Sequence, residues 1–190
     1  MRQVLAPMLG GGPTLAHQSF FTAANGTGIT SYTPDLGNAF VAVNGPIDIQ
    51  SNQANLVSST PSGTVVRSPL SAMPVKVKNF AKGSTVHRLY WHVNSINDIY
   101  ILQSTNANKL DLWRRIAGTW ALIATTASTW TTAGRNMQLD ITPNGADDDI
   151  VATDGVATIT MTVVAPNRHA SVAVGGSVMG DRADNLEAWI

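Results

Sequence analysis

Residues 150–159, Ile-Val-Ala-Thr-Asp-Gly-Val-Ala-Thr-Ile, carry the strongest fold signal in the chain. Asp154-Gly155 separates two runs of β-branched and small residues. A two-residue hairpin turn of type I′ needs a positive φ at both central residues, which Asp-Gly adopts readily. After the turn the side chains alternate, and the more apolar face consists of Ala157, Ile159, Met161 and Val163. The segment therefore predicts an antiparallel hairpin with one buried face.

Similar strand-like runs recur along the chain, separated by turn residues at intervals of about 8–12 residues, as in sandwiches and barrels. The clearest runs are 39–43, 46–50, 64–67, 75–80, 86–93, 98–104, 109–116, 120–125, 136–142, 156–164, 171–174 and 185–190. Helix formers are scarce, because the chain has one Glu and four Lys beside twenty Thr. The sequence predicts an all-β protein built as an antiparallel two-sheet sandwich.

The composition excludes several classes of function. The chain of 190 residues has twelve basic and twelve acidic side chains and no cysteine. A net charge of zero gives no overall attraction to nucleic acid, and the lack of cysteine excludes disulfides, zinc knuckles and thiol nucleophiles. No apolar run approaches the ~18 residues of a membrane span. We therefore expect neither a nucleic-acid partner nor a membrane.

Residues 1–18 are predicted to form an extended N-terminal arm, and residues 19–190 to form the sandwich domain. Gly10-Gly11-Gly12-Pro13 would serve as a swivel between them. Apolar side chains in such a tail favour docking on a partner over free movement in water. The residues expected to bind that partner are Val4, Leu5, Met8 and Leu9.

Six segments occur in an order that resembles one known fold. They are Phe-Thr-Ala-Ala-Asn-Gly-Thr (21–27), Tyr-Thr-Pro-Asp-Leu-Gly (32–37), Ile-Asp-Ile-Gln-Ser-Asn-Gln-Ala (47–54), Asn-Asp-Ile-Tyr-Ile-Leu (97–102), Leu-Asp-Leu-Trp-Arg-Arg-Ile-Ala-Gly-Thr-Trp (110–120) and Asp-Asn-Leu (184–186). Together they resemble the concanavalin A-like, laminin-G-like jelly-roll domains of tailed-bacteriophage virion proteins. The resemblance implies that the last strand lies beside the first.

The fold that this resemblance implies also occurs in glycoside hydrolases, which usually place two carboxylates across the scissile bond. Enzymes of this superfamily carry them as E-x-D-x-E on one strand, whereas Glu187 has no such neighbours. His87 and His92, five residues apart on one predicted strand, should face opposite sides, and no G-x-S-x-G elbow is present. We therefore predict a non-enzymatic protein without catalytic residues.

Asp147, Asp148 and Asp149 form the main acidic cluster. Calcium prefers oxygen ligands from such loops, and the resemblance to laminin-G-like domains implies one calcium ion. The spacing matches no EF-hand loop, so a solvated hairpin tip is the alternative interpretation. The three aspartates are candidate calcium ligands, and no other cofactor is predicted.

The chain has five tryptophans, and buried rings are the commoner arrangement in a two-sheet core. Exposed rings, in contrast, suit contact with sugars or protein subunits. Trp113 and Trp130 are predicted to lie at such a surface. Arg114 and Arg115 are predicted to contribute to the same surface, because planar guanidinium groups suit interfaces.

Two functions remain open. The first is a capsid decoration (cement) protein of a bacteriophage, located on the capsid surface of the virion. It would bind the major capsid protein or other virion proteins as a homo-oligomer, for which we expect a trimer. The alternative is a glycan-binding module of a tail or adhesion apparatus that holds a host surface. An exposed aromatic ring beside polar side chains would favour the alternative.

Overall fold

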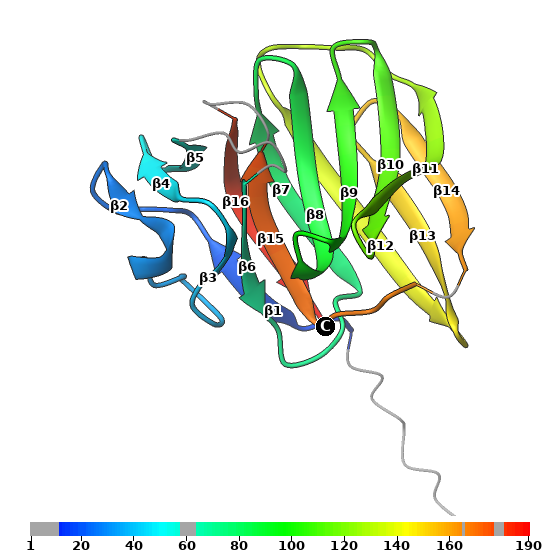
Figure 1. The fold of residues 1–190 in the computed structure, drawn as a ribbon, viewed down its shortest axis with the longest axis horizontal. Helices are drawn as coiled ribbons and strands as arrows, with labels where there is room; N and C mark the ends of the chain where they lie inside the picture. Colours follow the sequence, from blue (N-terminus) through cyan, green and yellow to red (C-terminus); the bar gives the residue numbers. More distant parts are fainter. Residues whose placement is uncertain (1–11, 58–63, 165, 177–180) are drawn as a thin grey trace, which may run out of the picture.

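The computed structural model describes residues 12–57, 64–164, 166–176 and 181–190, which form two antiparallel sheets packed face to face (Figure 1). In pairing order, one sheet consists of β14 (Thr158–Val163), β13 (Asp147–Thr153), β12 (Arg135–Asn144), β7 (Lys76–Lys82), β16 (Arg182–Trp189), β5 (Gln53–Leu56), β4 (Ile47–Gln50) and β2 (Thr27–Gly28). Its ninth strand, β1 (Leu15–Ser19), also pairs with β16. The seven-stranded sheet consists of β11 (Thr119–Ala127), β10 (Lys109–Ile116), β9 (Asp98–Thr105), β8 (Val86–Ser95), β15 (Ser171–Gly176), β6 (Thr64–Pro69) and β3 (Val41–Asn44). A 3-10 helix, η1 (Ile29–Ser31), follows β2.

The main core lies between the two sheets. Leu89 and Trp91 of β8 and Leu139 of β12 belong to it, and Leu110 and Leu112 of β10 are completely buried. Burial of each large apolar side chain contributes about 1.5–3 kcal/mol. The predicted all-β, two-sheet sandwich is confirmed. No helix among the described residues has the length and apolar character needed to cross a membrane.

Strands β13 and β14 form the hairpin predicted around Asp154-Gly155. Asp154 Oδ1 accepts hydrogen bonds from the backbone N–H groups of Val156 (3.0 Å) and Ala157 (2.8 Å), which fixes the turn. Ile159 and Val163 are buried on the predicted face. The hairpin and its buried face are therefore confirmed. The predicted type I′ turn is wrong, because Gly155 has a positive φ (+83°) and Asp154 does not; the backbone N–H of Asp154 donates to the carbonyl of Ala157 across Gly155 and Val156.

The first strand lies beside the last strand, as the resemblance implied, but it is β1 (Leu15–Ser19) and not the segment 21–27 that the resemblance marked as the opening strand. Leu15 pairs with Trp189 and Ser19 pairs with Leu186, so the first and last strands of the chain are neighbours. The sheet thus begins at Leu15, within the predicted arm of residues 1–18. The burial of this strand could not be predicted from its polar sequence, because its completely buried side chains are His17 and Ser19.

His17 ties β1 to the other sheet. Ser68 of β6 donates its hydroxyl proton to the carbonyl of Asn38 at 2.9 Å, so its oxygen accepts from His17 Nδ1 at 3.0 Å. His17 Nε2 is then the unprotonated nitrogen and accepts from the Ser19 hydroxyl at 2.8 Å. A neutral imidazole satisfies both serines, and a protonated ring would not.

Acidification should destabilise the protein in part through His17. Burial lowers the pKa of His17 to about 4, although Asp35 opposes the effect, while the ordinary value is 6.5. The unfolded chain therefore takes up this proton first, and stability is lost as the pH falls from about 6.5 to 4. Urea unfolding at pH 7 and pH 5 should reveal a loss of about 2 kcal/mol from this residue. In His17→Gln the pH dependence should shrink by that amount, and an unchanged dependence would contradict the assignment.

The alternation of β8 breaks at His92. Its φ is +49°, and the pairing of β8 with β9 shifts between Trp91 and Ser95. This irregularity turns the His92 ring toward Asp148 of the other sheet. His87 also faces inward, beside Trp130. The prediction that the two histidines lie on opposite faces is wrong, because a bulge resets the two-residue period.

Candidate functional site

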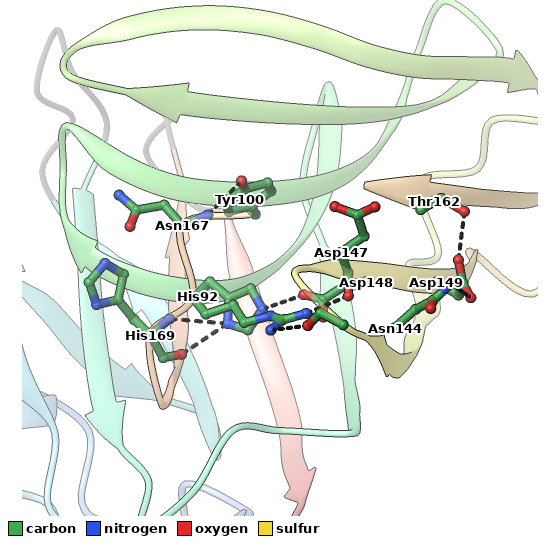
Figure 2. Close-up of polar contacts among 11 residues, drawn as sticks. His92, Tyr100, Asn144, Asp147, Asp148, Asp149, Thr162, Asn167 and His169 are labelled. Carbon is green, nitrogen blue, oxygen red and sulfur yellow. Dashed lines mark hydrogen bonds and ion pairs between the residues drawn. The ribbon is translucent and has the colours of Figure 1, made fainter. Parts of the chain in front are cut away.

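The three aspartates predicted as calcium ligands begin β13 and point in different directions (Figure 2). Asp148 is buried and turns toward His92. Asp149 instead accepts hydrogen bonds from Thr162 Oγ1 (2.6 Å) and Asn144 Nδ2 (3.0 Å). No cluster of three or more His, Cys, Asp and Glu side chains suited to a metal exists within the described residues. The structure does not bring the predicted ligands together, because neighbouring side chains of a strand alternate.

Asp148 is the centre of a polar cluster that joins the two sheets. Arg168 donates to Asp148 Oδ1 from Nε at 2.9 Å and from Nη2 at 2.6 Å. His92 Nε2 lies 3.4 Å from Asp148 Oδ2. Burial raises the pKa of the Asp148 carboxyl, but His92 and Arg168 outweigh burial and hold the pKa below its usual value. The carboxylate is thus engaged by protein partners.

Residues 167–169, which lead into β15, are held by the Asp148 cluster and by contacts to Asp98. His92 Nδ1 lies 2.9 Å from the carbonyl oxygen of His169. His169 Nε2 lies 2.9 Å from Asp98 Oδ2, and Asn167 Nδ2 donates to the same oxygen at 2.8 Å. The Asn167 backbone N–H donates to the Tyr100 hydroxyl at 3.2 Å (Figure 2). We assign these contacts a stabilising role at one end of the sandwich.

Arg114 and Arg115 do not share a surface, contrary to the prediction. Arg114 lines a groove of about 330 Å³ between the edge strands β11 and β14, together with Ile123, Met161 and Val163. Arg115 faces the other side of β10. Consecutive residues of a strand point in opposite directions, so the two guanidinium groups cannot act on one ligand.

Trp130 packs against His87 and does not join Trp113. Its ring stacks on His87, with centroids 4.3 Å apart and planes inclined by 14°. Burial lowers the pKa of His87 to about 4, and the charge of Arg135 lowers it as well, so the imidazole is neutral near pH 7. We therefore assign the half-buried Trp130 ring, which stacks on a neutral imidazole, a structural role.

The seven-stranded sheet has a second apolar cluster on the face turned away from the core, which we call the outer face. The cluster consists of Val65, Tyr90, Val93, Ile99, Ile101 and Ala173, with Trp113 packed against it. Directly paired residues of neighbouring strands lie on one face. The register therefore places one row across six strands, which we call the apolar row although it begins with an arginine. It consists of Arg67, Ala173, Tyr90, Ile101, Trp113 and Leu122.

A polar row runs beside this apolar row on the outer face. It consists of Arg88, Gln103, Asp111 and Thr125, which pair in turn across β8, β9, β10 and β11. Arg88 Nε donates to Gln103 Oε1 at 3.3 Å, and Thr125 Oγ1 donates to Asp111 Oδ1 at 2.6 Å. At ~4.8 Å per strand, the row spans about 14 Å. The four side chains form a line of hydrogen-bonding groups, in which Asp111 is 7 % exposed and the others are more accessible.

On the other side of the apolar row lie Ile99, Arg115 and Trp120. The Arg115 guanidinium carbon is 5.4 Å from the Trp120 ring centroid, and the Trp120 side chain is 42 % exposed. Trp120 was not predicted as a surface residue from the sequence. The turn at Ala117-Gly118, where both residues have positive φ, sets the register that places Trp120 on this face.

The predicted arm residues Val4, Leu5, Met8 and Leu9 lie outside the described residues. Docking of the arm on a partner therefore stays a prediction from the sequence.

Comparison with known proteins identifies the architecture. No protein-family model and no curated protein matches the chain. Among solved structures, the beta-glucanase of Bacillus licheniformis aligns with 95 % of this chain and 98 % of its own, at a TM-score of 0.55 and 9 % identity. This chain has the concanavalin A-like jelly-roll fold.

Two further structures of this kind align less closely. The carbohydrate-binding module CBM66 from Bacillus subtilis covers 80 % of this chain and 94 % of its own, with a TM-score of 0.48 and 12 % identity. The exoplasmic/lumenal domain of VIP36, in a form bound to Ca²⁺ and Man2, covers 91 % and 89 %, with a TM-score of 0.48 and 8 % identity. At such identities the likeness extends to the fold alone. The capsid role stays a prediction from the sequence.

Proposed function

We propose that this protein is a non-enzymatic glycan-binding module whose ligand lies across the outer face of the seven-stranded sheet. The observation that supports this most directly is the polar row of Arg88, Gln103, Asp111 and Thr125 beside aromatic rings. Sugars present hydroxyl groups on their edges and C–H groups on their faces. A line of donors and acceptors, with Trp113 in the next row and Trp120 in the row beyond it, offers partners for both.

The dimensions of the rows also suit a chain-like ligand. The polar row extends about 14 Å across four strands, which is the scale of a short oligosaccharide. Because the side chains come from paired strands, the sheet holds their spacing rigidly, and little ordering is needed on binding.

The carboxylate content of these rows favours binding over hydrolysis. In the described strands, the carboxylate in these rows is Asp111, which accepts a hydrogen bond from Thr125. Glycoside hydrolysis usually requires a second carboxylate across the scissile bond. The alternative of a capsid decoration protein, with the major capsid protein as partner, has no comparable support in the described residues.

Loss of Trp120 should weaken glycan binding about tenfold or more, because an exposed ring can supply about 1.4 kcal/mol or more of stacking. The measurement is affinity electrophoresis through gels that contain individual polysaccharides, followed by calorimetry on those that retard the protein. Val151→Ala is the matched control, since Val151 is also 42 % exposed but lies on β13 of the other sheet. Wild-type protein that no glycan retards, or Trp120→Ala that binds as tightly as wild type, would sink the proposal.

A further inference from the structure

The outer face is strongly cationic although the whole chain is neutral. Strand alternation and register place four cations there, namely Arg67, Arg88, Lys109 and Arg115. The same strands place one carboxylate on this face, Asp111. Burial raises the pKa of the Tyr90 hydroxyl, and the charge of Asp181 adds to this effect, so a second carboxylate lies near one end of the face. A positive excess remains in either case.

The guanidinium groups on this face are held by neutral acceptors. Arg67 Nη1 donates to the carbonyls of Val93 (3.1 Å) and Asn94 (2.9 Å). Arg115 donates to the carbonyls of Gly118 and Ile96, at 3.1 Å in each case. These contacts fix the direction of each side chain without neutralising its charge.

No ion pair with a carboxylate neutralises the charge of these cations among the described residues. The ion pairs among them are Lys76–Asp140, His92–Asp148, Arg168–Asp148 and His169–Asp98. None includes a cation of the outer face. Arg67 Nε and Trp113 Nε1 are buried without a hydrogen-bond partner, so the charge of this face reaches a ligand through the other guanidinium and ammonium atoms.

We infer that the ligand of this face is an acidic glycan, one whose sugars carry carboxylate or sulfate groups. This inference rests on the proposed function and specifies its substrate class. Arginine and lysine bind such anions through charge-assisted hydrogen bonds, which are about twice as strong as neutral ones. A neutral glycan would leave the cations of the outer face without counter-charges.

Matched pairs of polymers test the inference. The full chain is titrated with polygalacturonate and with its methyl ester, and with dextran sulfate and dextran. The charged member of one pair should bind at least about tenfold more tightly, and added salt should weaken its binding. The carboxylate pair and the sulfate pair then identify which anion is recognised.

Charge variants locate the effect. Arg88→Gln should weaken binding of the charged polymer about tenfold, and Lys109→Gln, at an exposed position, should weaken it without risk to the fold. Lys76→Gln is the control, because that cation pairs with Asp140 on the other sheet. Equal affinity for charged and neutral polymers overturns the inference and leaves the proposed function standing. Failure to bind any glycan overturns both, and a single-stranded oligonucleotide that binds more tightly than polygalacturonate assigns the face to nucleic acid.

Discussion

Asp148→Ala should destabilise the protein by about 3–5 kcal/mol, the typical cost of removing one partner from a buried ion pair. The Asp148 side chain is 4 % exposed and contacts both Arg168 and His92. Its removal leaves the Arg168 guanidinium group, which is 26 % exposed, without a counter-charge and leaves the buried His92 ring without its carboxylate partner. For a domain of this size the change corresponds to a fall in melting temperature of about 10 °C.

Asp149→Ala is the matched control, because Asp149 lies one residue away and bonds only to side chains near the surface. Its melting temperature should fall by less than about 3 °C. Calorimetry of both variants provides the comparison. If calcium raises the melting temperature of the wild type and of neither variant, the three aspartates form a metal site after all, and our assignment of Asp148 to a closed cluster fails.

Gly175→Ala should lower the free energy of unfolding by about 3 kcal/mol and displace Tyr90, which lies in the apolar row beside the polar row. A Cβ atom at Gly175 would lie 2.4 Å from the backbone oxygen of Thr64 and 3.2 Å from Cζ of Tyr90. Neither neighbour can yield easily, since one is backbone in β6 and the other is a buried ring. The variant should therefore lose stability and glycan affinity together.

Gly28→Ala provides the control for this prediction. Gly28 has a φ of −60°, and a Cβ atom at this position would come no closer than 3.9 Å to its nearest neighbour, Asp48 Oδ1. Urea unfolding should show little change for Gly28→Ala. A Gly175→Ala protein with wild-type stability would mean that β6 and Tyr90 pack less closely than the structure shows.

Much of the fold could be predicted from the sequence, because local signals carried it. Asp154-Gly155 marks a hairpin turn through the positive φ of Gly155 and the side-chain acceptor of Asp154, and the apolar face from Ala157 to Val163 follows from strict alternation. The pairing of first and last strands came from the resemblance of ordered motifs. Strand β1 was missed because its buried residues, His17 and Ser19, are polar.

The candidate site could not be predicted in the same way, because it depends on register between strands. Arg115 and Trp120 meet only through the turn at Ala117-Gly118, and Arg88 meets Gln103 across another hairpin. Alternation alone would have separated Arg114 from Arg115. The bulge at His92, in contrast, has no local sequence signal and reverses the face that alternation assigns.

The most direct test of the central claim is to map the ligand by NMR. Uniformly ¹⁵N-labelled protein is titrated with an oligosaccharide of the polymer that binds best. We predict chemical-shift changes at the amides of Arg88, Gln103 and Asp111 and at the indole N–H of Trp120, with little change in β12, β13 and β14. Shifts that gather on the nine-stranded sheet, while the outer face of the seven-stranded sheet is unchanged, would contradict the claim.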